Sequence, residues 1–96
     1  MSMIKNPMHP GEVLRELYMM PLGLSAGGLA KHLDVPRTRI ERLVKGDTAL
    51  TADTAIRLSV FFANTAEYWL NLQRAHDLAE AEKIVDVSNI QPLEAA

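Results

Sequence analysis

Residues 29–46 read LAKHLDVPRTRIERLVKG, and this stretch decides the fold of the chain. Apolar residues three and four apart predict two short amphipathic helices on either side of a tight turn at Pro36. The second of these helices would expose one polar, mostly cationic set: Arg37, Thr38, Arg39, Arg42 and Lys45. This pattern is typical of a helix-turn-helix, in which the second helix lies in the major groove of DNA.

An N-terminal helix precedes this stretch. Pro10 suits the first position of a helix, and Pro21 with Gly23 would end it. The spacing predicts one apolar face, formed by Val13, Leu14 and Leu17.

The two helices of the motif have their own start and stop signals. Ser25 is a predicted N-cap for the first, and Gly46 is placed to end the second as a left-handed C-cap. The inward residues would be Leu29, Ala30 and Leu33 in the first helix, and Ile40, Leu43 and Val44 in the second.

Two further helices are predicted after Gly46. Thr51 and Thr65 would cap them, with Asp53 and Glu67 in their first turns, where the helix dipole favours an acid. Their inward faces would hold Ala55, Ile56, Leu58 and Phe62, and then Tyr68, Trp69, Leu72, Ala75, His76 and Ala79.

These segments predict an all-α, five-helix domain that spans residues 1–96. It would comprise an N-terminal arm (1–8), a helical core (9–83) and an extended C-terminal tail (84–96). The β-branched run Ile84–Ser88 predicts a short strand or an extended segment within that tail.

Composition narrows the class of protein. The chain has no cysteine, which excludes disulfides and thiolate metal sites, and no apolar run approaches the ~18 residues of a membrane span. We therefore expect a cytoplasmic protein with no membrane partner.

The net charge is −2, but it is unevenly distributed: residues 1–50 carry +2 and residues 51–96 carry −4. The acidic half is either a solvated surface or a face for a basic partner.

The exposed residues of the second motif helix have predicted DNA contacts. Base contacts would come from Arg37, Thr38, Glu41 and Arg42, with the arginines suited to guanine and Thr38 to a thymine methyl. Glu41 could instead hold Arg37 or Lys45 in place. Backbone contacts would come from Arg39, Lys45 and Ser25. The competing interpretation is an ordinary solvated helix face.

Nothing in the sequence predicts catalysis, a cofactor or a metal site. His9, His32 and His76 are widely spaced and form no i, i+4 pair. No serine lies in a nucleophile elbow, and Gly27-Gly28 has no following Lys-Ser/Thr that would make a phosphate loop. We therefore expect a protein that is not an enzyme.

The start of the last predicted helix is crowded with apolar residues: Tyr68, Trp69, Leu70 and Leu72. Three consecutive large residues span ~200° of a helix, so they cannot all face one core. Some are therefore expected at a homodimer interface. A two-fold dimer would set two DNA-reading helices about one DNA turn, ~34 Å, apart.

These motifs resemble a known family. The motif itself resembles the phage-repressor (Cro/C1, XRE) class, and residues 7–85 resemble the HigA-type (VapI-like) antitoxins of type II toxin–antitoxin systems. The matching stretches are His9-Pro10-Gly11-Glu12-Val13-Leu14, Leu29-Ala30 with Leu33 and Val35-Pro36, Ile40 with Gly46, Leu50–Leu58 and Trp69-Leu70-Asn71-Leu72-Gln73.

The resemblance implies a lambda-repressor-like domain that binds an operator in double-stranded DNA and represses its own operon. It also implies a partner, a small basic toxin resembling the RelE-type ribonucleases. One departure concerns the first motif helix, which opens Ser25-Ala26-Gly27-Gly28 where the family usually has polar, phosphate-contacting residues. Each glycine costs about 1 kcal/mol relative to alanine inside a helix, so we expect a less rigid helix, although its backbone N–H groups could still hold a phosphate.

Two other functions remain open from the sequence. One is a stand-alone repressor without a toxin. The other is an interaction module that has lost DNA binding, in which substitution of Arg37 and Arg42 would change no binding activity.

Overall fold

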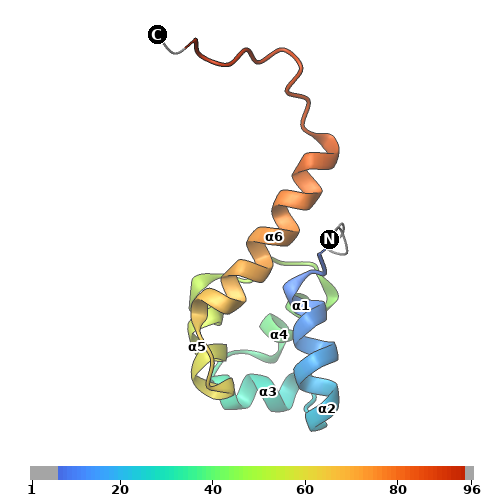
Figure 1. Cartoon of the computed structure of the whole chain (residues 1–96). Helices are drawn as coiled ribbons and strands as arrows, with labels where there is room; N and C mark the ends of the chain where they lie inside the picture. Colours follow the sequence, from blue (N-terminus) through green and yellow to red (C-terminus); the bar gives the residue numbers. More distant parts are fainter. Residues whose placement is uncertain (1–6, 95–96) are drawn as a thin grey trace.

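The structure is a computed structural model that describes residues 7–94. Three helical segments, α1 (Pro10–Val13), η2 (Leu14–Met19) and α2 (Met20–Leu22), follow one another without a break and form the first helix. The others are α3 (Ala26–Leu33), α4 (Arg37–Lys45), α5 (Ala52–Phe62) and α6 (Ala66–Ile84) (Figure 1). The predicted all-α, five-helix architecture is therefore confirmed, and no strand occurs within residues 7–94.

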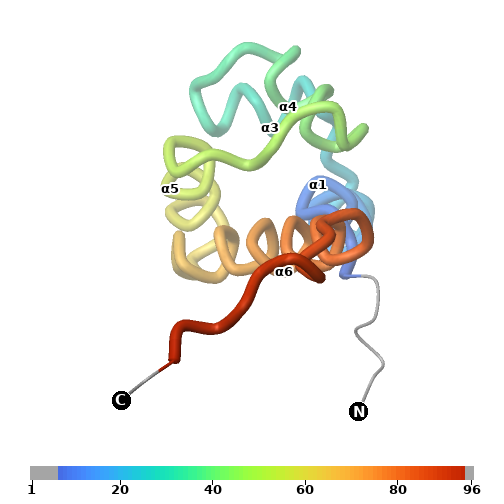
Figure 2. Tube along the Cα trace, turned by 90° about the horizontal axis from the view of Figure 1, so that it is seen from above, coloured from blue at the N-terminus to red at the C-terminus, as the bar shows by residue number. Residues whose placement is uncertain are grey.

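The helices surround one core. Viewed from above, α3 and α4 lie on one side of the molecule and α6 on the opposite side, with α5 and the first helix between them (Figure 2). The largest fully buried side chains are those of Trp69, Leu14, Leu29, Ile40, Leu43, Leu58 and Pro10. This arrangement leaves the outer face of α4 on the surface.

The predicted helix caps are present. Ser25 Oγ accepts a hydrogen bond from the N–H of Gly28 at 3.0 Å, and Thr65 Oγ1 accepts one from the N–H of Tyr68 at 3.0 Å. Thr51 caps α5 in the same way. Gly46 ends α4 in the left-handed region at φ 81°, where a side chain would be strained.

The apolar face of the first helix differs from the prediction. Leu17 is 63% exposed, whereas Met19 is buried. The cause is the π-helical segment η2, whose wider turns advance the register so that Tyr18 and Met19, not Leu17, point inward. The 3.6-residue period used for the prediction does not hold across such a segment.

The inward face of α5 also differs at one position. Ala55 and Leu58 are buried as predicted, but Ile56 is 56% exposed. Successive residues are about 100° apart on a helix, so a face centred on Ala55 and Leu58 turns Ile56 toward solvent.

The first turn of α1 packs directly on the end of α4. A Cβ built on Gly11 would lie 1.7 Å from the carbonyl oxygen of Leu43. Only glycine allows the two backbones to approach so closely. Pro10 begins the helix at this point and is itself buried.

His9 caps α1 beside that contact. Its Nδ1 accepts a hydrogen bond from the N–H of Gly11 at 2.9 Å, and its ring meets the ring of His76 edge-on at 5.1 Å. Burial, and then the neighbouring His76, lower the pKa of His9, although the backbone of Thr48 and the carboxylates of Asp77 and Glu12 act in the opposite direction. The cap requires the neutral ring, because a protonated Nδ1 cannot accept a hydrogen bond.

Polar side chains of α6 hold the loop between α4 and α5. Gln73 is buried; its Oε1 accepts a hydrogen bond from the N–H of Leu50 at 2.6 Å, and its Nε2 donates to Asp77 at 2.8 Å. The Trp69 indole Nε1–H donates to Asn64 Oδ1 at 2.8 Å. Buried polar groups need such partners, so the Gln73 bond fixes α6 against the loop before α5 and the Trp69 bond fixes it against the loop after α5.

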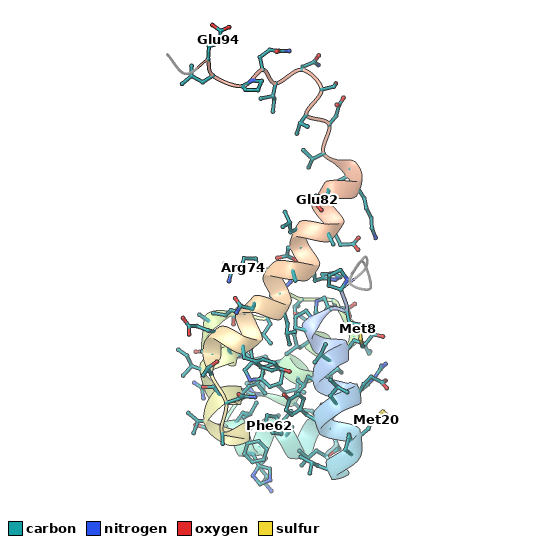
Figure 3. All side chains as sticks on the ribbon, viewed as in Figure 1. Met8, Met20, Phe62, Arg74, Glu82 and Glu94 are labelled. Carbon is teal, nitrogen blue, oxygen red and sulfur yellow. The ribbon has the colours of Figure 1, made fainter. Side chains whose placement is uncertain are left out.

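The second half of α6 extends beyond the core. The described chain measures 55 × 26 × 24 Å, and α6 with the tail accounts for the long dimension (Figure 1). In Figure 3, Arg74 and Glu82 project from α6, and Glu94 lies near the far end of the tail. Beyond Ile84 the tail is extended and forms no strand through Glu94, so the predicted short strand is wrong and the extended segment is confirmed.

We predict that Gly11→Ala lowers the free energy of unfolding by about 1–3 kcal/mol, because the new methyl group overlaps the Leu43 carbonyl group and helix α1 must shift. Urea denaturation followed by circular dichroism measures the change. Gly27→Ala is the control, since a Cβ at that position meets only side-chain atoms of Arg37. Equal unfolding midpoints for Gly11→Ala and the parent chain would contradict the close contact.

We also predict a loss of stability in mild acid that depends on His9. Its pKa is lowered in the folded chain, so below about pH 6.5 the unfolded chain binds the extra proton more readily and stability falls. The free energy of unfolding should therefore decrease between about pH 7.5 and 5.5. In His9→Asn, which keeps a capping group but does not titrate, this decrease should be smaller. Identical pH profiles for the two chains would rule out the role of His9.

Candidate nucleic-acid interface

Helix α4 presents a polar outer face because its apolar residues are committed to the core. Pro36 precedes the helix with an extended backbone, ψ 145°, as expected for the N-cap position. Ile40 and Leu43 are 0% and 2% exposed and anchor the inner face. The side chains at 37, 38, 39, 42 and 45 are all exposed, and Glu41 is half-buried.

The turn between α3 and α4 is tight and left-handed. Asp34 adopts φ 59°, a conformation that aspartate tolerates better than most residues. The N–H of Val35 donates to the Ala30 carbonyl group at 3.0 Å, which closes the end of α3. The predicted helix-turn-helix is therefore present, with Asp34 at the position that turns the chain.

Arg37 lies against the start of α3. Its Nε lies 3.1 Å from Glu41 Oε2, one helical turn away, and the two side chains form an ion pair. A Cβ on Gly27 would come within 3.1 Å of Arg37 Cδ. The missing side chain at Gly27 thus leaves room for Arg37, a role that its helix propensity did not suggest. Of the alternatives for Glu41, holding Arg37 in place is the one seen in the unbound chain.

Arg39 is paired within the chain. Its Nη1 lies 2.7 Å from Asp53 Oδ1 on α5, and the same oxygen accepts from Arg57 Nε at 2.7 Å. These two guanidinium groups, Arg57 first, lower the pKa of Asp53. The guanidinium group of Arg39 is therefore held by Asp53, whereas a side chain that binds phosphate would be unpaired.

Thr38 and Arg42 line an open groove between α4 and the loop that leads to α5. The groove has a volume of about 470 Å³. Its other lining residues are Pro36, Arg39, Thr48, Ala49, Thr51, Asp53 and Thr54. The hydroxyl groups and the guanidinium group of Arg42 can donate hydrogen bonds to base edges or to phosphate oxygens of nucleic acid.

Ser25 and Lys45 lie at the two ends of the motif. Ser25 is exposed, but its hydroxyl oxygen caps α3, so what faces outward there is the start of the helix backbone. Lys45 is exposed in the last turn of α4. Their contacts to a DNA backbone stay predictions.

The predicted dimer residues pack differently from expectation. Trp69 is 0% exposed and belongs to the core, so its placement at a surface between chains is wrong. Tyr68, Leu70 and Leu72 are half-buried against the same core, and the hydroxyl groups of Tyr18 and Tyr68 are 2.9 Å apart. Burial and the Tyr18 hydroxyl raise the pKa of Tyr68 to about 12. Bulky residues at adjacent positions are accommodated because α5 and the first helix cover α6 from two sides.

Exposed apolar residues occur further along α6 instead. Leu78, Ala81, Val85 and Val87, with Glu82, line a surface depression formed by the last turns of α6 and the start of the tail. Leu78 is 59% exposed and Val85 is 59% exposed. These four apolar residues are called the α6 stripe below.

Comparison with known proteins identifies the family. Residues 14–69, which include the whole of α3 and α4, match the helix-turn-helix family model. The chain belongs to the helix-turn-helix family. It is 50% identical to virulence-associated protein I of Dichelobacter nodosus over 85% of this chain and 76% of that protein. It is also 38% identical to antitoxin HigA-1 of Vibrio cholerae, over 77% of this chain and 70% of that protein.

A solved relative gives the same fold. The structure of the Pseudomonas aeruginosa antitoxin HigA with the higBA promoter matches with a TM-score of 0.82 and 34% identity, covering 93% of this chain and all of that one. The predicted lambda-repressor-like fold and the HigA-type resemblance are thereby confirmed. Membership of this DNA-binding family also agrees with the prediction that this helix-turn-helix chain is not an enzyme.

Two residues important to this surface were missed from the sequence. Arg57 and Asp53 link α5 to the motif, yet the sequence analysis placed Asp53 only as a favourable first-turn acid. Their i, i+4 spacing was a visible signal for an ion pair, but not for the contact with Arg39.

Within residues 7–94, no helix is both long enough and apolar enough to cross a membrane. The same residues contain no cluster of three histidine or acidic groups placed to bind a metal ion.

Proposed function

We propose that this chain is an antitoxin that binds operator DNA in its own promoter through α4 and represses transcription. The observation that carries the proposal is the exposed polar face of α4, seated on a buried inner face. The similarity to an antitoxin HigA whose structure includes promoter DNA supports it.

The side chains of α4 have different roles in this proposal. Arg42 and Thr38, which line the groove, read bases, with Arg42 donating two hydrogen bonds to a guanine. Arg37 reads a base in the orientation set by Glu41 and Gly27. Lys45 and the backbone N–H groups that follow Ser25 bind phosphates at either end.

Because the chain has a net negative charge, its affinity for DNA has to come from a small cationic region. Non-specific affinity for DNA comes from cations that neutralise phosphates, and this chain has a net charge of −2. Affinity therefore depends on the local cations of α4 and on two copies binding adjacent half-sites.

We predict that Arg42→Ala weakens binding to duplex DNA from upstream of its own gene by about 1–3 kcal/mol. Fluorescence anisotropy at a fixed salt concentration measures this, with a shuffled duplex of equal length as the non-specific reference. Arg74→Ala is the matched control, because Arg74 is exposed and belongs to α6, the helix that lies opposite α4 in Figure 2. If the parent chain binds both duplexes equally, or if Arg42→Ala binds as the parent does, the proposed operator recognition fails; if the parent chain binds neither duplex, a module without DNA binding is favoured.

We propose further that the chain is a homodimer and that it neutralises a small basic toxin of the RelE-like ribonuclease class. A second copy would cover the α6 stripe, because this apolar surface projects beyond the core and nothing in residues 7–94 packs over it. The toxin would be attracted by residues 77–94, which hold five acidic side chains against one lysine. The alternative is a stand-alone repressor without a toxin.

Light scattering tests the homodimer, and co-expression tests the toxin partner. Light scattering of the chain alone should give twice the protomer mass, and Leu78→Asp should give the protomer mass because it places a charge in the stripe. Co-expression of the chain with the protein encoded by the neighbouring gene should yield a heavier complex. In this complex the ribonuclease activity of the neighbouring protein should be lost. A monomeric parent chain would contradict the dimer, and a neighbouring protein that does not co-purify would favour the stand-alone repressor.

A further inference from the structure

A network of charged groups joins the helix-turn-helix to α5 beside the groove, which two of its members, Arg39 and Asp53, also line. Its members are Arg39 of α4, Asp53 and Arg57 of α5, and the carbonyl groups of Leu33 and Asp34 at the turn, and it is called the Asp53 network below. Arg57 Nη1 donates to the Leu33 carbonyl oxygen at 2.9 Å and to that of Asp34 at 3.3 Å. Its Nε donates to Asp53, which also accepts from Arg39 Nη1 at 2.7 Å.

The guanidinium group of Arg57 therefore contacts the end of α3 directly and reaches α4 through Asp53. Arg57 belongs to α5, its Nη1 contacts the end of α3, and its Nε contacts the carboxylate that holds Arg39 of α4. The end of α3 carries partial negative charge on its unpaired carbonyl groups, which favours a cation there. Only a planar fork of donors reaches both directions at once; the ammonium of lysine is a single point of charge.

We propose that Arg57 is a positioning residue for DNA recognition. It fixes the angle between α3 and α4 and, through Asp53, keeps Arg39 paired within the chain instead of with a DNA phosphate. Arg39 is thus assigned to the positioning of α4 instead of to a phosphate contact. This inference rests on the proposed DNA-binding function.

The side chains of the Asp53 network are too exposed for their ion pairs to contribute much to folding stability, so we assign the network a role in positioning. The side chains of Arg39, Asp53 and Arg57 are 41%, 55% and 37% exposed. Ion pairs this accessible contribute little to folding because water and salt screen them. The contribution of the network lies in which orientation of α4 it selects, since α4 makes its other contacts through Ile40 and Leu43 at the core.

The first test is Arg57→Lys, which keeps the charge and removes the fork. Binding to duplex DNA from upstream of the gene should weaken on the order of ten-fold, since charged hydrogen bonds that orient the motif are lost. Urea unfolding should shift little, and Arg74→Lys on α6 should leave both quantities unchanged. Parent-like affinity in Arg57→Lys overturns the proposal, as does a fall in affinity no larger than its fall in folded fraction.

The second test needs no DNA. Hydrogen–deuterium exchange of the free chain should speed up in Arg57→Lys at the amides of α4 and the Asp34 turn, while α6 stays as protected as in the parent. Unchanged exchange in α4 overturns the positioning role. If the parent chain binds no DNA, the proposed function fails, and this measurement still decides whether Arg57 positions α4.

The third test concerns Arg39 directly. A residue that binds a phosphate contributes about 0.9 to the slope of log affinity against log salt concentration, so removing it reduces the slope by that amount. Arg39→Gln should weaken binding with an unchanged slope, whereas Asp53→Asn should free Arg39 and make the slope steeper. A smaller slope in Arg39→Gln would show that Arg39 contacts a phosphate and would overturn this part of the inference.

Discussion

The contact between the first turn of α1 and the last turn of α4 constrains the rest of the molecule. Gly11 brings a helix backbone onto the Leu43 carbonyl group with no side chain between them. The end of α4 is thereby held at a fixed height above the core, while its start is left at the surface. His9 on one side and Gly46 on the other complete this junction, and both depend on it.

Helix α4 is attached at its end and along its flank. The attachment at the end is apolar and close-packed, so it tolerates no added atoms. The attachment on the flank is the Asp53 network, which is polar and open to solvent. The two attachments differ in what disturbs them: volume changes act on the first, and charge or salt acts on the second. Of the residues proposed to read bases, Arg37 and Thr38 lie in the first turn of the helix and Arg42 lies in its last turn.

Much of this arrangement could be predicted from short-range signals. Capping hydroxyl groups and terminal glycines act within a few residues, so Ser25, Thr51, Thr65 and Gly46 predicted the helix ends correctly. Leu17 was placed wrongly because a π-helical segment changes the period that the prediction assumes. Trp69 was placed correctly on the inward face of the last helix, but its assignment to a homodimer interface was wrong, because only the tertiary structure shows that two helices cover α6 from different sides. The link from Arg57 to the Asp34 turn spans 23 residues and leaves no local pattern.

Gly27 has no side chain, yet it controls where the long side chain of Arg37 lies. It lies on α3, outside the set of residues proposed to touch bases, yet the space above it is where Arg37 rests. Relatives that keep every residue of α4 but carry a larger side chain at this position would direct the same arginine elsewhere. Promoter preference within such a family can then diverge through substitutions in the supporting helix, so two proteins with identical reading helices need not recognise the same sequence.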